Sequence, residues 1–427
     1  MGAGWIARDA AVVWHGFTQM AAFAANEPVI VERAEGRELI DVDGRRYLDA
    51  ISSLWVTTLG HRVPELDAAL LEQLERVAHS TLLGNGNRIV VELAEALADV
   101  VPVPSPHLLF ASDGAAAVEQ AIKIAFQYWV NEGVTEKTRY LAFGGAYHGD
   151  TIGALSVGGE GFAGDLFDAL RFPVVRAPGF DDPGCFEVAA GLLRARAPEL
   201  AAVVVEPLVQ GAAGMVTAAP ESFGPLTEAC RATGVLLICD EIATGFGRTG
   251  TLFASEQCGL EPDLMCLGKG LTGGYLPMAA TVATERVYES FLGEDLGPRT
   301  LYHGHSYQGN ALGSAVALRH LRLLCEGDVL TNVRDRSSEL AKLLQEQVAT
   351  LPGVVAVRLQ GLMGGVEVDA RVLSARRVAA AAVRRGVLLR SLGDVITVVP
   401  PLTVTSEEIG RIVDALGAAL EEVAEGR

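Results

Sequence analysis

The stretch Val235-Leu-Leu-Ile-Cys239 is apolar throughout and is followed directly by two carboxylates, Asp240 and Glu241. A strand that is apolar on both faces is typical of a parallel sheet covered by helices on both sides. A second apolar run, Leu264-Met-Cys266, precedes a lone lysine, Lys269, that lies among glycines. Ligands of open α/β sheets bind beyond the carboxyl ends of the strands. We therefore expect Asp240 and Lys269 to belong to one small-molecule site.

Further apolar runs on the N-terminal side of this stretch alternate with helical patterns. They are Leu108-Leu-Phe110, Arg139-Tyr-Leu-Ala-Phe143 and Ala201-Ala-Val-Val-Val205. This alternation predicts an α/β fold, with a mainly parallel sheet in one large domain that comprises residues 60–330.

The two ends of the chain have shorter elements. After an irregular start, we expect an antiparallel meander of three short strands, Pro28–Val31, Glu38–Asp41 and Arg46–Asp49. Near the other end, Thr405-x-x-Glu408 has the pattern of a capping box and predicts a final helix. We expect residues 1–59 and 331–427 to fold together as one small α+β domain.

Composition argues against several classes of partner. The chain has 34 basic and 53 acidic residues and a formal charge of -19, so it would repel a nucleic-acid backbone. No apolar run approaches the roughly 18 residues of a membrane span, and the start lacks the pattern of a signal peptide. We therefore expect a cytoplasmic protein without a membrane partner. The six cysteines show no C-x-x-C spacing, which favours buried thiols over a metal site.

The run Ser112-Asp-Gly-Ala115 separates a predicted strand from a predicted helix. Small residues at a helix start let backbone N–H groups approach an anion, and the helix dipole favours a phosphate there. The same residues also fit an ordinary turn in which Asp113 caps the helix. A phosphate cup and a simple cap both stay open for this stretch.

Two more strand ends carry polar groups. Tyr147-His-Gly-Asp150 places an aromatic ring, an imidazole and a carboxylate on a glycine-rich loop, which fits either a ligand loop or a packed core. Glu206 follows an apolar run, as Asp240 does. A buried carboxylate must be solvated, paired or matched to a ligand cation, and two such carboxylates side by side indicate a site.

The loop Gly245-Phe-Gly247-Arg-Thr-Gly250 matches the dinucleotide pattern G-x-G-x-x-G, so an NAD-dependent dehydrogenase is an alternative. That pattern should leave its strand directly and open a helix, whereas residues 240–244 intervene here and no helical run follows. Gly268-Lys269-Gly270 is not a P-loop, because neither Ser nor Thr follows the lysine. The local context therefore disfavours a nucleotide-binding site.

Lys269 has no charged neighbour in the run Met265–Leu276. Burial among apolar residues lowers the pKa of a lysine and makes its amine a usable nucleophile, which an imine-forming cofactor needs. Asp240 would then pair with a pyridinium nitrogen. A phosphate cup, an aromatic ring, a buried carboxylate and a buried lysine together indicate a site for pyridoxal 5′-phosphate.

The chain resembles the class III aminotransferases of pyridoxal-phosphate fold type I. The resemblance rests on the motifs Trp14-His-Gly-Phe-Thr-Gln-Met20, Tyr147-His-Gly-Asp150, Asp240–Gly250, Gly268-Lys269 and His303-Gly-His-Ser-Tyr307. It implies a seven-stranded sheet and a cytoplasmic homodimer with active sites at the subunit interface. Within the class, the chain is most similar to the branch that converts 8-amino-7-oxononanoate to 7,8-diaminononanoate in biotin biosynthesis. Another class III ω-aminotransferase is the alternative.

The resemblance also implies which residues contact the cofactor. Lys269 is expected as the Schiff-base lysine and proton shuttle, and Asp240 as the partner of the pyridine nitrogen. Tyr147 would lie over the ring and complete the catalytic set. The phosphate would be bound by two residues of the same subunit and two of the second subunit, namely Gly114 and Ala115, then His305 and Ser306.

The resemblance also implies the substrate contacts. Gly304 would lie beside the substrate, and Arg390 would hold its carboxylate. Phe17, Leu54 and Trp55 would line the channel for the methylene chain, and Tyr147 and Lys269 would also touch the substrate. Members that use S-adenosylmethionine as amino donor have Tyr at Phe17, Trp at Leu54 and Ser at Ala115. A branch that uses lysine resembles this chain more closely, so the donor stays open between S-adenosylmethionine and lysine.

Overall fold

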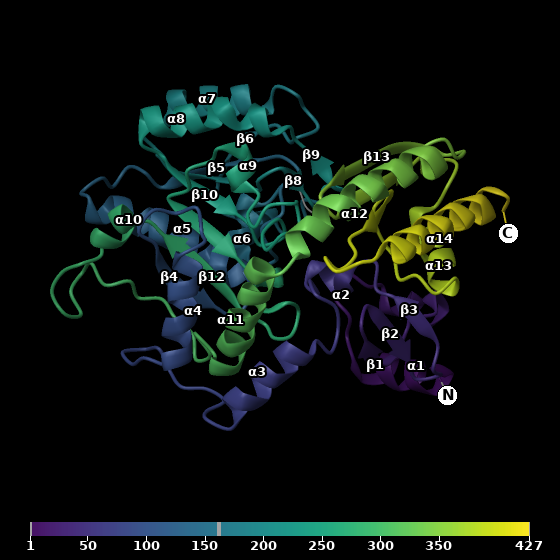
Figure 1. The fold of residues 1–427 in the computed structure, drawn as a ribbon. Helices are drawn as coiled ribbons and strands as arrows, with labels where there is room; N and C mark the ends of the chain where they lie inside the picture. The colour runs from purple at the N-terminus through teal and green to yellow at the C-terminus, as the bar shows by residue number, and fades with distance from the viewer. Residues whose placement is uncertain (1, 160–163, 427) are drawn as a thin grey trace.

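The computed structural model describes residues 2–159 and 164–426. Its centre is a seven-stranded sheet with the strand order β4-β12-β11-β10-β7-β5-β6 (Figure 1). The strands are β4 (His107–Ala111), β12 (Ala279–Ala283), β11 (Leu264–Leu267), β10 (Leu236–Asp240), β7 (Leu200–Val205), β5 (Arg139–Phe143) and β6 (Val175–Ala177). β12 runs antiparallel to both of its neighbours, and the other four pairings are parallel. The prediction of a mainly parallel seven-stranded sheet is confirmed.

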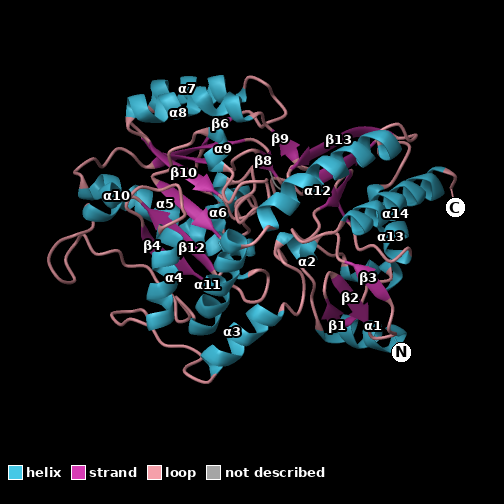
Figure 2. Cartoon of the chain, viewed as in Figure 1, coloured by secondary structure: helices cyan, strands magenta, loops and turns pink. Residues whose placement is uncertain are grey.

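Helices cover both faces of this sheet. Successive side chains of each strand point to opposite faces, and both faces are buried. Leu236 and Ile238 of β10 pack with α5 (Gly114–Asn131), whereas Leu237 and Cys239 pack with α7 (Cys185–Arg196) and α8 (Gly224–Thr233). Figure 2 shows α7 and α8 together on one side of the magenta strands. The other helices of this part of the chain are α2 (Ser52–Trp55), α3 (Pro64–Leu74), α4 (Arg88–Ala98), α6 (Ile152–Val157), α9 (Ser255–Cys258), α10 (Glu285–Glu289) and α11 (Ala311–Glu326).

The strand register brings two carboxylates and the lysine to one edge of the sheet. Asp240 pairs with Cys266 of β11, and Cys239 pairs with Val205 of β7. Glu206 and Asp240 therefore leave the sheet at neighbouring positions, and Lys269 follows β11 on the other side of β10. This edge is where ligands bind in open α/β sheets.

The chain starts with a helix, α1 (Gly2–Val12), and the expectation of an irregular start is wrong. α1 buries no residue, so the apolar periodicity that reveals most helices is missing, and its alanines stabilise it by intrinsic propensity. The predicted meander is present as β1 (Val31–Glu35), β2 (Glu38–Asp41) and β3 (Arg46–Leu48), although β1 begins where the predicted first strand ends.

The C-terminal part forms a four-stranded sheet of order β13-β14-β16-β15. Its elements are α12 (Val329–Leu343), β13 (Val354–Gln360), β14 (Met363–Val368), α13 (Ala375–Arg384), β15 (Arg390–Leu392), β16 (Val395–Val398) and α14 (Ser406–Ala424). The predicted capping box of Thr405 and Glu408 is present at the start of α14. Leu48 donates to the carbonyl of Gly386 and accepts from Leu388, so the two chain ends lie side by side (Figure 1). The division into domains at residues 60 and 330 stays a prediction.

Candidate active site

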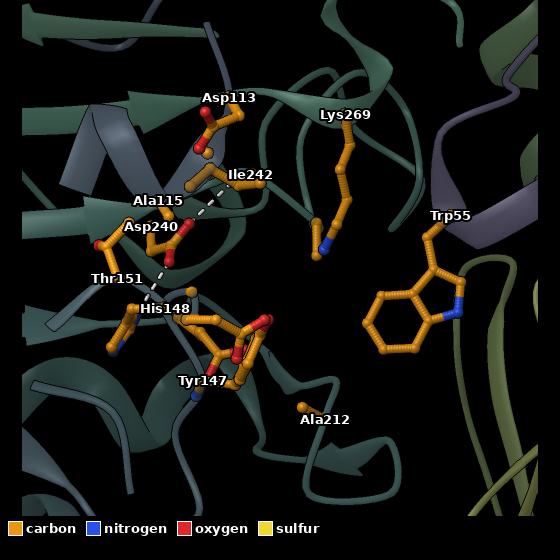
Figure 3. A pocket seen from close by; sticks show the side chains of 15 residues that line it. Trp55, Asp113, Ala115, Tyr147, His148, Thr151, Ala212, Asp240, Ile242 and Lys269 are labelled. Atoms are coloured by element: carbon orange, nitrogen blue, oxygen red, sulfur yellow. Dashed lines mark hydrogen bonds and ion pairs between the residues drawn. The ribbon is translucent and has the colours of Figure 1, made fainter. Parts of the chain in front are cut away.

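A cavity of about 500 Å³ lies beyond the carboxyl ends of five strands of the central sheet. It is lined by residues at or just beyond the ends of β4 (Asp113 to Ala115), β5 (Tyr147 to Thr151), β7 (Glu206), β10 (Asp240, Ile242 and Ala243) and β11 (Lys269). Six residues predicted for the site line it together: Trp55, Gly114, Ala115, Tyr147, Asp240 and Lys269. Figure 3 shows these side chains around the cavity, with Trp55 on the opposite side from Asp240.

Lys269 begins a short 3-10 turn, Lys269–Thr272, directly after β11 and Gly268. Its backbone has a φ of 40°, a left-handed value that a non-glycine residue adopts only where its surroundings impose it. The amine Nζ lies 4.8 Å from the centre of the Trp55 ring, across the cavity (Figure 3). Burial lowers the pKa of Lys269, and the charges of Asp240 and Glu206 oppose this shift. The lysine thus loses its proton more readily than an exposed lysine, as a nucleophilic amine requires.

Asp240 is held by a histidine that comes from the β5 loop. His148 Nδ1 lies 2.6 Å from Asp240 Oδ2, and Asp240 Oδ1 accepts the backbone N–H of Ile242 at 3.0 Å. Burial alone would lower the pKa of His148, but the hydrogen bond and charge of Asp240 outweigh it, and the pKa is raised. The raised pKa favours the charged form of His148 beside Asp240, and the carboxyl group of Asp240 also lines the cavity, where it can meet a ligand cation.

The start of α5 combines the two interpretations that were open for Ser112–Ala115. Asp113 is the N-cap and its carboxylate accepts the backbone N–H of Ala116 at 3.0 Å, while Gly114 and Ala115 line the cavity. A Cβ at Gly114 would lie 2.9 Å from Cγ2 of Ile242, so a larger residue would force that side chain or the helix start to shift. The helix therefore presents a close backbone and a positive dipole end to an anion in the cavity.

Tyr147 is fixed at both its backbone and its ring. Its backbone N–H donates to Glu206 at 3.1 Å, and its phenol donates to Asp150 at 2.9 Å. Burial, together with the hydrogen bond to Asp150, raises the pKa of the phenol, so the ring stays neutral. Tyr147 thus offers a neutral aromatic surface beside Asp240 (Figure 3).

Six predicted site residues lie outside this cavity. Phe17 and Arg390 line a separate hollow of about 1370 Å³ between the N-terminal segment and α13. Leu54, next to Trp55, is 46% exposed and lines neither space. Gly304, His305 and Ser306 belong to a loop that packs beside His79, whose Nε2 lies 2.7 Å from the carbonyl oxygen of Ser306.

Three residues with clear contacts in the site were not among the predicted site residues. They are His148, Glu206 and Ile242. The signal for them was available, because each follows the end of an apolar strand, and His148 and Glu206 were already noted as polar groups at such ends. No local sequence pattern reveals the contact between His148 and Asp240, because the two residues lie at the ends of different strands.

The glycine-rich loop Gly245–Gly250 does not form a dinucleotide site. It consists of turns, and the next helix, α9, begins only at Ser255. The Arg248 side chain is buried and donates to the carbonyl of Pro400 and to Ser52 Oγ. This loop packs against the chain ends and offers no free helix start to a pyrophosphate.

The chain belongs to the class III aminotransferases, since the sequence profile of the family "Aminotransferase class-III" matches residues 20–420. These enzymes depend on pyridoxal phosphate. A relative from Nitratidesulfovibrio vulgaris, named adenosylmethionine-8-amino-7-oxononanoate aminotransferase, is 44% identical, with 98% of this chain and 81% of that protein covered. A relative of the same name from Geobacter sulfurreducens is 41% identical, with 97% of this chain and 96% of that protein covered.

Solved structures show the same fold. The crystal structure of adenosylmethionine-8-amino-7-oxononanoate aminotransferase from Methanocaldococcus jannaschii superposes with a TM-score of 0.94 at 37% identity, covering 99% of this chain and 98% of that chain. An amine transaminase from an uncultivated Pseudomonas species in its pyridoxal-phosphate-bound form gives a TM-score of 0.90 at 33% identity, covering 96% and 99%.

The cavity fits the chemistry of pyridoxal phosphate. A buried amine (Lys269), a buried carboxyl group (Asp240) and the backbone of a helix start (Gly114 and Ala115) face one space, and they match the aldehyde, the ring nitrogen and the phosphate of the cofactor. Within residues 2–159 and 164–426, no cluster of three or more His, Cys, Asp or Glu side chains is arranged to hold a metal ion. In the same residues, no helix has the length and apolar character needed to cross a membrane.

Proposed function

We propose that this protein transfers an amino group to 8-amino-7-oxononanoate and forms 7,8-diaminononanoate, a step of biotin biosynthesis, with S-adenosylmethionine or lysine as amino donor. The observation that carries this proposal is the cavity in which Lys269 and Asp240 face each other across the space for a cofactor. The names of relatives that match nearly the whole chain support the choice of substrate.

Lys269, Asp240 and Tyr147 would hold the ring end of the cofactor, and the amides of Gly114 and Ala115 would hold its phosphate. When bound, pyridoxal phosphate supplies a carbonyl that reacts with amines and a ring that accepts electrons. Lys269, whose pKa burial lowers, would take the proton from the α-carbon of the amino donor and would return a proton later in the cycle. Asp240, which is paired with His148, would hold a proton on the ring nitrogen.

Arg390 would bind the carboxylate of the substrate, and Phe17, Leu54 and Trp55 would contact its methylene chain. Arg390 and Phe17 line the same hollow, which supports a shared role at the end of the substrate far from Lys269. Replacing Phe17 by Tyr is expected to favour S-adenosylmethionine over lysine as donor, because the hydroxyl adds a polar contact for the adenosyl group.

The functional unit would be a cytoplasmic homodimer, in which Gly304, His305 and Ser306 reach the site of the second subunit. This assignment is supported by their loop, which lines no part of the cavity of its own chain. It is also supported by two aromatic residues on the same loop region, Tyr302 and Tyr307, which are 64% and 67% exposed. Large exposed aromatic side chains are typical of surfaces that contact another protein.

A second candidate is another class III ω-aminotransferase activity. It is favoured by the TM-score of 0.90 with the amine transaminase and by a similar value for an ω-transaminase of Thermomicrobium roseum, 0.89 at 32% identity. Both candidates keep Lys269 and Asp240 and differ in the substrate that they accept.

The deciding experiment separates the two half-reactions. The cofactor-loaded protein is mixed with S-adenosylmethionine, with lysine or with simple amines, and the loss of its visible absorbance is followed. The amine form is then isolated and mixed with 8-amino-7-oxononanoate, and 7,8-diaminononanoate is detected by mass spectrometry. Formation of this product at rates far above those with other ketones supports the proposal, whereas equal or faster reaction of unrelated ketones would favour the general ω-aminotransferase.

A further inference from the structure

Glu206 lines the cavity, yet the reaction as described above gives it no role. It is 6% exposed and follows β7, beside the end of β10. Its two carboxylate oxygens hold two different backbones: Oε2 accepts the N–H of Tyr147 at 3.1 Å, and Oε1 accepts the N–H of Gly211 at 3.3 Å. One side chain thus joins the loop that carries Tyr147 to the turn after β8 (Val209–Gln210).

The titratable groups near Glu206 lie at the ends of neighbouring strands of the sheet. His148 and Tyr147 belong to the β5 loop, Asp240 ends β10, and Lys269 follows β11. The charge of Arg176 in β6 lowers the pKa of His148, and the Arg176 guanidinium donates to the carbonyl of Ser156. Among the described residues, no lysine or arginine forms an ion pair with Glu206, so its carboxylate relies on the two backbone N–H groups and on His148.

The pKa of Glu206 lies near neutral pH. Burial raises the pKa of Glu206 to about 7, an effect that His148 opposes and Asp240 reinforces. His148 and Asp240 are locked as a pair at 2.6 Å. Glu206 can take up or release a proton near neutral pH without breaking that pair.

We propose that Glu206 is a positioning residue of the active site, which fixes the Tyr147 loop against the Gly211 turn and sets, through its own charge, the field at the His148–Asp240 pair. This inference rests on the proposed function, in which Asp240 meets the ring nitrogen of the cofactor and Tyr147 covers the ring. Ionised Glu206 stabilises protonated His148 and therefore the ionised Asp240 that holds the cofactor. Neutral Glu206 weakens that stabilisation.

Two substitutions separate position from charge. Glu206→Gln removes the charge and presents an NH₂ group to one of the two backbone N–H donors, so one of the two bridges is lost. Glu206→Asp keeps the charge but shortens the side chain, so it cannot span both backbones. The matched control is Glu241→Gln, because Glu241 is likewise buried, directly after β10, but contacts Thr244 and Ser255 and does not line the cavity.

The first measurement is the affinity for pyridoxal phosphate, titrated by visible absorbance at pH values on both sides of 7. Affinity of the wild-type protein is expected to change through the pKa of Glu206, about 7. Glu206→Gln is expected to bind about tenfold more weakly above that pH, the effect of one unsatisfied buried N–H, with a flat pH dependence. Glu206→Asp is expected to bind more weakly but to keep a pH dependence, and Glu241→Gln to match the wild type.

The second measurement needs no cofactor and no activity. Glu206 has a folded-state pKa raised from 4.5 to about 7, so wild-type stability relative to Glu206→Gln should fall as pH rises from 4.5 to 7 and stay constant above. A wild-type protein that fails to bind pyridoxal phosphate would refute the proposed function but leave this pH dependence testable. The inference about Glu206 is overturned if Glu206→Gln binds the cofactor with wild-type affinity and pH dependence, or if the stability difference does not change with pH.

Discussion

His148 Nδ1 lies 2.6 Å from Asp240 Oδ2, and both side chains are buried next to the cavity. The pair joins two strands that are separated by β7 in the sheet, because His148 follows β5 and Asp240 ends β10. Its pairing explains how an ionised carboxylate persists in an apolar sheet, where an isolated charge would be expelled or neutralised.

The pair makes a prediction about stability and pH. The pKa of His148 is raised above 6.5, so the stabilisation by the pair is complete below pH 6.5 and is lost as pH rises through the raised value. The difference in free energy of unfolding between the wild type and His148→Gln should therefore be largest below pH 6.5 and shrink above it. Urea unfolding at a series of pH values measures this difference, and a difference that grows with pH would refute the assigned protonation state.

Asp240→Asn tests the other half of the pair. The variant keeps the shape of the side chain but removes the charge that holds a proton on the ring nitrogen, so we expect kcat to fall by about a hundredfold or more, while cofactor binding persists. Steady-state kinetics of the loaded protein measure the effect. A kcat within a few-fold of the wild type would show that Asp240 does not act on the cofactor.

The crowded helix start predicts the result of Gly114→Ala. The new Cβ would lie 2.9 Å from Cγ2 of Ile242, so either that side chain or the helix start must move into the cavity, and we expect cofactor affinity to fall by about tenfold or more. Gly191→Ala in α7 is the matched control, because nothing lies within 4 Å of its added Cβ. Absorbance titration compares the two variants, and equal affinities would argue against a phosphate site at Gly114.

Arg390→Ala tests the assignment of the substrate carboxylate. Loss of a charge-assisted contact to a group far from the reacting carbon should raise KM about tenfold or more and leave kcat much less affected. For an amine substrate that lacks a carboxylate, the KM of Arg390→Ala should equal the KM of the wild type. An unchanged KM for 8-amino-7-oxononanoate would place the carboxylate elsewhere.

Shared active sites can be tested by mixing two inactive chains. One chain carries Lys269→Ala, and the other carries combined substitutions of His305 and Ser306 that block the phosphate contact. A mixed dimer contains one site with an intact lysine and intact phosphate contacts if these residues reach across the interface, so activity should reappear on mixing. Mixtures that stay inactive, while mixed dimers are demonstrated by differential tags, would contradict the sharing.

The parts of the fold that were predicted correctly are those whose signal is local. β5 and β2 have the predicted bounds, and Asp240, Glu206 and Lys269 follow apolar runs whose pattern marks them as strand ends. β12 was missed because Ala279-Ala-Thr-Val-Ala283 is rich in alanine, which strands disfavour, and its burial depends on neighbours from elsewhere in the chain.

The site was predictable to the same extent. Residues at or directly beyond strand ends could be assembled from the rule that parallel strands end at one edge, which is why five of the predicted residues meet in one cavity. The sixth, Trp55 of α2, was assigned from the family resemblance. The places of Phe17, Arg390 and the loop of His305 depend on how the chain ends pack and on contacts between subunits. No pattern within a single strand or helix encodes these contacts, so their roles came from the family resemblance alone.

The most direct test of the central claim is to identify the lysine that binds pyridoxal phosphate. The chain has four lysines, Lys123, Lys137, Lys269 and Lys342, so a peptide map resolves them all. The protein is incubated with the cofactor below pH 10.5, the ordinary lysine pKa, reduced with borohydride, digested and examined by mass spectrometry. The account predicts one phosphopyridoxyl group per chain, on Lys269, and none in Lys269→Ala. A label on Lys123 or Lys342 instead, or equal labelling of Lys269→Ala, would contradict it.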